Sequence, residues 1–194
     1  PSADLEYRLN STNLFAIMYN YANMVYYPGV SYSINTPGAR YRYYFTKQLY
    51  TEGRIGLDVI STSEKVSYYK PFFQLSLTKY INENSMSTFS FTKRYSLTGN
   101  SSNLLNNWRI QGEYSNQFAQ RITVYGNIFY GNGDYIAEQA ENSFFGLTLR
   151  GAYALTQHIN LFAEYGLMVN NTETGSETFS YNRHRITIGA RGEL

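Results

Sequence analysis

The chain has 194 residues and a formal net charge of +2, with 15% of its residues charged and 18% aromatic. This length accommodates one domain, and a small net charge without a run of like charges argues against a nucleic-acid partner. The absence of cysteine excludes disulfides and thiolate metal sites, and no apolar run approaches the ~20 residues of a membrane helix. No signal peptide is visible at the start, so we expect any such segment to have been removed.

Apolar and polar side chains alternate through most of the chain. Residues 54–59 show the alternation over a short stretch. Residues 158–170 show it over about twice the length of a typical strand. Strict alternation is typical of strands whose two faces meet different environments. In chain order it predicts ten strands, at residues 13–23, 38–47, 50–61, 70–80, 86–96, 106–116, 119–131, 143–155, 158–170 and 180–193.

Two kinds of connection separate these predicted strands. Short polar breaks lie near residues 48, 82, 118 and 157. Stretches rich in Ser, Thr, Gly, Asn and Glu lie between them, at residues 61–68, 97–106, 131–143 and 171–180. The chain is therefore predicted to alternate tight turns at one end of the strands with longer loops at the other.

Long alternating strands with this layout give the chain its resemblance to small outer-membrane β-barrels of Gram-negative bacteria. The resemblance implies an all-β fold, an antiparallel up-and-down transmembrane β-barrel of about ten strands with short periplasmic turns and longer extracellular loops. It also implies location in the bacterial outer membrane, with the lipid bilayer and its lipopolysaccharide as surroundings. The soluble alternative, a lipocalin-like barrel or a β-sandwich, would turn the apolar face inward.

The resemblance covers residues 12–194, which we assign to the barrel domain. Residues 1–11 are assigned to an N-terminal extension or connector. Leu5, Tyr7 and Leu9 alternate with polar residues there, so this segment is predicted to be either a short extra strand or a connector from a preceding domain.

The 21 tyrosines and the position of Lys93 fit a lipid-facing outer surface. Aromatic rings gather in girdles at the two boundaries of a membrane, and Tyr44, Tyr80, Tyr114 and Tyr153 lie where strands meet short turns. Lys93 shares parity with apolar neighbours, so we expect it on the outer face near a boundary, where its ammonium reaches water.

The opposite parity carries the charged residues that we expect to line the lumen: Arg40, Arg42, Arg54, Asp58, Arg109, Glu113, Arg121, Arg150, Glu164, Arg185, Arg191 and Glu193. Barrels of eight strands have room only for their own side chains, so a ten-strand lumen is predicted to be largely filled. Within it we expect arginines and carboxylates to pair across the lumen, because unpaired buried charges are costly. The excess of arginine favours, as the alternative, a narrow passage that prefers anions.

Catalytic residues are not identified. His158 lies in a short turn, and His184 shares parity with Ile186 and Ile188, so neither is placed beside an acid or nucleophile. No cofactor and no metal site is predicted. The function predicted first is a non-enzymatic membrane scaffold or surface-interaction barrel, with another protein or a polysaccharide as a candidate partner at the loops or the N-terminus. The alternatives are a narrow anion-leaning channel or export passage, and an outer-membrane hydrolase or lipid-modifying enzyme.

Overall fold

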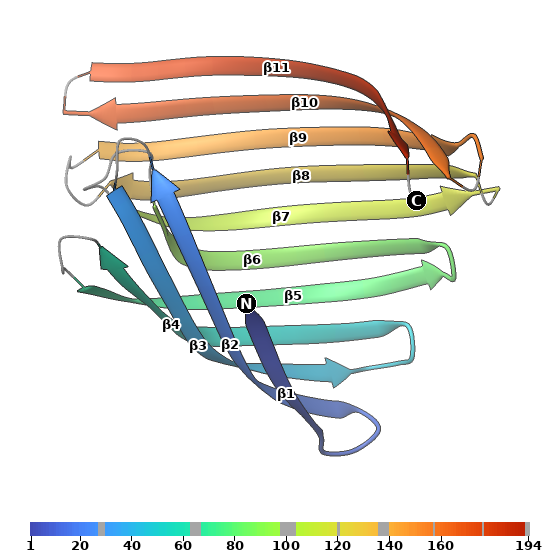
Figure 1. The fold of residues 1–194 in the computed structure, drawn as a ribbon, viewed down its shortest axis with the longest axis horizontal. Helices are drawn as coiled ribbons and strands as arrows, with labels where there is room; N and C mark the ends of the chain where they lie inside the picture. The colour runs from blue at the N-terminus through green and yellow to red at the C-terminus, as the bar shows by residue number, and fades with distance from the viewer. Residues whose placement is uncertain are drawn as a thin grey trace.

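One antiparallel sheet makes up the fold. The computed structural model describes residues 1–26, 30–62, 67–97, 104–119, 121–135, 140–156, 158–175 and 177–192. These residues form eleven strands: β1 (Ser2–Arg8), β2 (Asn13–Tyr26), β3 (Val30–Tyr44), β4 (Leu49–Thr62), β5 (Ser67–Asn82), β6 (Ser85–Leu97), β7 (Leu104–Phe118), β8 (Ile122–Tyr135), β9 (Ala140–Ala154), β10 (Ile159–Thr174) and β11 (Glu177–Gly192). Each strand pairs with the next in chain order, from β1 to β11, so the predicted up-and-down topology is confirmed (Figure 1).

Within the described ranges, no helix is long and apolar enough to cross a membrane.

The ten predicted strands correspond to β2–β11, but the real strands are longer than predicted, at 13 to 16 residues each. β3 begins at Val30 instead of residue 38, even though Pro37 lies within it. Proline has no N–H to donate, and the β3–β4 pairing is interrupted between Asn35 and Gly38, which accommodates it.

The strands extend into two of the stretches predicted as longer loops. Residues 131–135 and 140–143 belong to β8 and β9, and residues 171–174 and 177–180 belong to β10 and β11, while residues 136–139 and 176 lie outside the described residues. Polar residues in these stretches pair within the ladder. Asn142, for example, is buried and accepts a hydrogen bond of 3.2 Å from the Thr172 hydroxyl. Polarity had indicated a loop, whereas hydrogen-bonding partners on neighbouring strands make these residues compatible with a sheet.

The first strand, β1, lies in the segment assigned above to an extension or connector. Its seven residues pair with β2 in antiparallel register, with Leu5 opposite Ile17. The apolar alternation of residues 5–9 therefore marks an eleventh strand that folds as part of the sheet.

The sheet has two chemically different faces, which we call inner and outer. In Figure 1 the sheet curls so that β1, β2 and β3 pass in front of the wall formed by the later strands. Along β5 every second side chain is less exposed than its neighbours, as expected for the crowded concave side. The outer face carries large exposed apolar side chains on every strand from β1 to β11, from Leu5 to Ile188, which is 81% exposed. This extended apolar surface matches the predicted lipid-facing side of the sheet.

Four of the boundary positions named above separate into two groups. Tyr114 and Tyr153 lie on the outer face, as predicted, and Lys93 also lies there, opposite Phe73 and Trp108. Tyr44 and Tyr80 were wrongly placed in the outer girdle. Their strand positions face inward, where both rings approach that of Tyr50, with centroid distances of 5.4 and 6.3 Å.

Candidate functional site: the charged inner face

Glu52 is the centre of an ion-pair cluster on β3 and β4. Arg42 lies directly opposite it in the ladder and donates to Oε2 from Nε at 2.8 Å and from Nη2 at 2.6 Å. Arg54, two residues along β4, contacts Oε1 through Nη2 at 2.6 Å. Glu52 is only 5% exposed, and its two oxygens are each bound by a different guanidinium, which offsets the cost of burying the carboxylate.

Strand β1 supplies the carboxylates of a second cluster, around Arg40. Arg40, on β3, contacts Glu6 and lies 3.4 Å from the Asp4 carboxylate, reaching across the whole width of β2. The β2 residue between Arg40 and Glu6 in the register is Ala16, which is 0% exposed. A larger side chain at Ala16 would block this path, so its small size permits the contact.

Asp58 on β4 holds a third cluster and is 2% exposed. It accepts hydrogen bonds from Arg94 on β6, at 2.8 and 2.9 Å, and from the Thr36 hydroxyl on β3, at 2.7 Å. Arg94 crosses β5 with its guanidinium carbon 5.3 Å from the centre of the Phe72 ring. This bond set fixes β3, β4 and β6 to one another through a single carboxylate.

A polar trough runs along the inner face from β3 to β7. It has a volume of about 310 Å³. Its floor is made mainly of hydroxyl and amide side chains: Gln74, Ser76, Thr78, Thr88, Ser90, Thr92 and Gln111. Arg42, Glu52 and Arg54 lie at one side of this trough, and Arg109 and Glu113 at the other. The short side chains of the floor leave space above them, which long charged side chains would have filled.

The inner face of β7 to β9 carries arginines of a different kind. Arg109 and Arg150 form no ion pair among the described residues, and each instead lies over an aromatic ring. The guanidinium carbon of Arg109 is 5.3 Å from the Phe129 ring centre, and that of Arg150 is 4.9 Å from the Phe162 ring centre. Glu113 forms no ion pair with them among the described residues, and it accepts hydrogen bonds from the neutral groups of Gln111 at 2.8 Å and Tyr125 at 2.9 Å. These arginines retain uncompensated positive charge facing the inner space.

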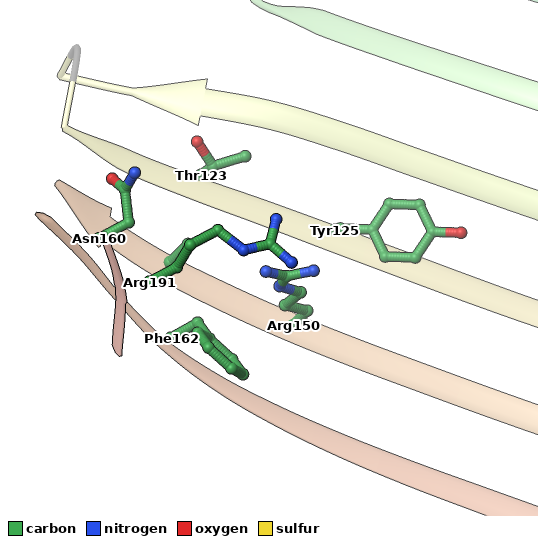
Figure 2. Close-up of a pocket in the computed structure, with 7 residues that line it drawn as sticks. Thr123, Tyr125, Arg150, Asn160, Phe162 and Arg191 are labelled. Carbon is green, nitrogen blue, oxygen red and sulfur yellow. The ribbon is translucent and has the colours of Figure 1, made fainter. Parts of the chain in front are cut away.

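Four strands, β8 to β11, line a hollow that contains a pair of arginines. It has a volume of about 450 Å³ and is lined by Thr123, Tyr125, Arg150, Ala152, Asn160, Phe162 and Arg191. Figure 2 shows the guanidinium groups of Arg150 and Arg191 directed toward the same region, between Tyr125 and Phe162.

The structure accounts for eleven of the twelve charged residues expected to face the lumen, since Glu193 lies outside the described residues. Ten are on the inner face of strands: Arg40, Arg42, Arg54, Asp58, Arg109, Glu113, Arg150, Glu164, Arg185 and Arg191. Arg121 lies exposed in the turn before β8. Their part in lining an aqueous passage stays a prediction.

The expected pairing across the lumen is wrong for the described ion pairs. They join residues on the same strand, on adjacent strands or on strands separated by one other strand. Arg185 and Glu164, 2.7 Å apart on the adjacent strands β11 and β10, are an example. Neighbouring inner-face positions are only about 5 Å apart across a ladder, so long side chains reach a partner along the wall.

Sequence reasoning missed Asp4, Glu6 and Arg94 as members of the inner face. Arg94 directly follows Lys93, so the outward parity of Lys93 already placed it on the inner side. For Asp4 and Glu6 the signal was the alternation of residues 5–9, which predicted either a short extra strand or a connector.

The two histidines lie where the alternation predicted. His158 is exposed in the turn before β10, and His184 is on the outer face, where its Nδ1 lies 2.9 Å from the Tyr165 hydroxyl. Among the described residues, no group of three or more His, Asp or Glu side chains has the arrangement of a metal site.

A protein-family model described as LamB porin matches residues 82–191, which is more than half of the chain. The chain belongs to the LamB porin family. Membership agrees with the outer-membrane barrel expected from the alternation, and it places this porin in the bacterial outer membrane. No curated protein sequence matches the chain.

Solved structures share the fold of this porin at low sequence identity. OmpT, an outer membrane protein of Vibrio cholerae, matches with a TM-score of 0.67 and 13% identity, over 98% of this chain and 63% of OmpT. The outer membrane channel DcaP of Acinetobacter baumannii matches with a TM-score of 0.61 and 13% identity, over 99% of this chain and 62% of DcaP. The chain therefore spans less than two thirds of the length of either protein.

Proposed function

We propose that this chain forms the wall of an outer-membrane passage for small hydrophilic solutes, with a preference for anions. The observation that carries the proposal is the polar trough between β3 and β7, whose floor of serine, threonine and glutamine leaves open space on the inner face. Hydroxyl and amide groups replace water contacts of a polar solute, so such a surface favours its transit.

The preference for anions rests on the arginines of the later strands. Arg109 and Arg150 have no carboxylate partner among the described residues, whereas Glu52 and Asp58 are each neutralised by arginine. Positive groups that face an aqueous passage attract anions and repel cations. The net field of the inner face is therefore expected to be positive.

A passage replaces the filled scaffold that the sequence favoured. A filled lumen requires arginine and carboxylate side chains that project into the space. In the structure they lie along the wall in pairs or over rings, which supports an open inner space. Membership of a porin family also supports a passage better than a closed scaffold.

Other parts of the functional prediction remain proposals. Lipopolysaccharide at the outer face, and another protein or a polysaccharide at the connections or the N-terminus, are candidate partners. The absence of catalytic activity is likewise still a prediction, which assays of lipid and peptide hydrolysis by the purified protein would check.

Planar-bilayer recordings under a KCl gradient test the passage directly. We expect discrete conductance steps with a reversal potential that indicates chloride preference. Replacing one arginine near a passing ion removes about 1 kcal/mol of attraction at about 4 Å in water. Arg109→Ala and Arg150→Ala should therefore each move the reversal potential toward cation preference, and the double variant should move it further.

Lys93→Ala is the matched control, because it removes one positive charge from the outer face. Its reversal potential should equal that of the unmodified protein. A correctly inserted protein that shows no conductance would contradict the passage, and cation preference in the unmodified protein would contradict the proposed selectivity.

A further inference from the structure

The hollow between β8 and β11 combines charge and ring surface in one place. Arg150 and Arg191 line it together with Tyr125, Phe162, Thr123 and Asn160, around about 450 Å³ (Figure 2). This volume is within the range of small-molecule sites, roughly 300–1,000 Å³.

The positive charge of the hollow is not neutralised by its surroundings. Arg150 lies opposite Glu164 in the ladder, but the Glu164 carboxylate accepts a hydrogen bond of 2.7 Å from Arg185. Arg150 and Arg191 form no ion pair among the described residues. Two guanidiniums directed toward the same region match the charge and geometry of a carboxylate.

The aromatic part of the hollow is held in place by its neighbours. Phe162 lies opposite Gly189 in the ladder, and a Cβ built on that glycine would lie 2.8 Å from the ring. The glycine therefore makes room for the ring to lean over β11, beside Arg150. On the other side, the Tyr125 hydroxyl is fixed by its hydrogen bond to Glu113. Phe162 is in contact with the Arg150 guanidinium, whose carbon is 4.9 Å from the ring centre, and it still lines the hollow.

We infer that this hollow binds a carboxylate carried on a six-membered ring, with Arg150 and Arg191 holding the carboxylate and Phe162 packing against the ring. The inference deepens the proposed passage by naming a solute class and rests on it for biological meaning. Guanidinium and carboxylate match in geometry and charge, and an aromatic face packs against either an aromatic ring or the C–H face of a sugar. Aromatic acids and sugar acids share this chemistry.

Calorimetric titration of the detergent-purified protein tests binding without requiring conduction. The probes are benzoate and glucuronate, with benzamide and glucose as their neutral counterparts and acetate as the acid without a ring. We expect at least one ring acid to bind at least about tenfold more tightly than its neutral counterpart and than acetate, since hydrogen bonds to charged groups contribute that much or more.

The pattern of binding identifies the source of the ligand. Binding of benzoate alone assigns the site to aromatic acids, glucuronate alone assigns it to sugar acids, and binding of both supports the shared chemistry. Equal affinity for acetate, or for the neutral counterparts, would overturn the inference.

Variants locate the site. Arg150→Gln and Arg191→Gln should each weaken ring-acid binding by about tenfold or more. Arg183→Gln is the matched control, because Arg183 is on the inner face of β11, eight positions from Arg191 and outside the hollow. Unchanged affinity in both hollow variants, or an equal loss in Arg183→Gln, would overturn the assignment. A variant counts only if its heat-dependent gel mobility matches that of the unmodified protein.

The two proposals fail in different ways. A protein that conducts chloride without binding ring acids loses this inference and keeps the passage. A protein that binds ring acids without conducting loses the passage and keeps the binding site.

Discussion

The inner face of β1 to β4 and that of β7 to β9 use arginine for opposite purposes. On the first, Arg40, Arg42 and Arg54 surround the carboxylates of Glu6 and Glu52. On the second, Arg109 and Arg150 lie over phenylalanine rings without a carboxylate partner among the described residues. One protein thus contains both a neutralised and a positively charged wall.

The difference between the two regions follows from how deeply the charged groups are buried and from whether a carboxylate lies within reach of each arginine. A buried ion pair is costly to break, about 3–5 kcal/mol, because one charge is left behind without compensation. A guanidinium over a ring at a more open site contributes about 0.5–1 kcal/mol. We therefore expect stability to depend on the first region and solute selectivity on the second.

The largest expected effect is on stability and comes from Asp58→Asn. The substitution keeps the shape of a residue that is 2% exposed but removes the charge that Arg94 binds. We expect a loss of about 3 kcal/mol in the free energy of unfolding, at the lower end for a buried pair because Arg94 is partly exposed. Urea unfolding in lipid vesicles, followed by the fluorescence of Trp108, measures it.

The matched control for this variant is Glu164→Gln. It breaks the ion pair with Arg185, whose side chain is 62% exposed, so the loss should stay below about 1 kcal/mol. Equal losses in the two variants would show that burial does not separate the ion pairs as we propose.

A smaller loss is expected from enlarging Ala16. In Ala16→Leu the new side chain occupies the path by which Arg40 reaches Glu6, at a position that is 0% exposed. Overpacking of this kind costs about 1–3 kcal/mol. Ala163→Leu adds the same atoms on the exposed outer face of β10 and should change the unfolding midpoint little. A neutral Ala16→Leu would mean that Arg40 has another route to a carboxylate.

The two faces of the sheet were predictable from sequence because alternation is a local property. Parity alone placed ten charged residues on the inner face and Lys93 on the outer one. Tyr44 and Tyr80 were misplaced because their nearness to a turn was given more weight than their parity.

The ion-pair partners were not predictable in the same way. The contact of Arg40 with Glu6 depends on the register of three strands and on the small size of Ala16 between them. The bonds from Arg94 to Asp58 depend on a side chain that crosses β5. Strand ends were underestimated for a related reason: polar residues such as Asn142 are stable in a strand only because a neighbour such as Thr172 pairs with them.

The smallest expected effect on stability tests most directly whether the two regions use arginine differently. Arg150→Ala removes a guanidinium that lies over Phe162 and forms no ion pair among the described residues, so the unfolding free energy should fall by about 0.5–1 kcal/mol. Arg42→Ala is the matched contrast, because it takes two hydrogen bonds from the buried Glu52 carboxylate and should cost several times more. The same urea titration compares both. Equal destabilisation would give Arg150 a structural role like that of Arg42, and the positive wall would then be part of the scaffold. A small loss in Arg150→Ala together with a changed reversal potential would separate selectivity from stability, because the charge would then matter to the passing ion and not to the fold.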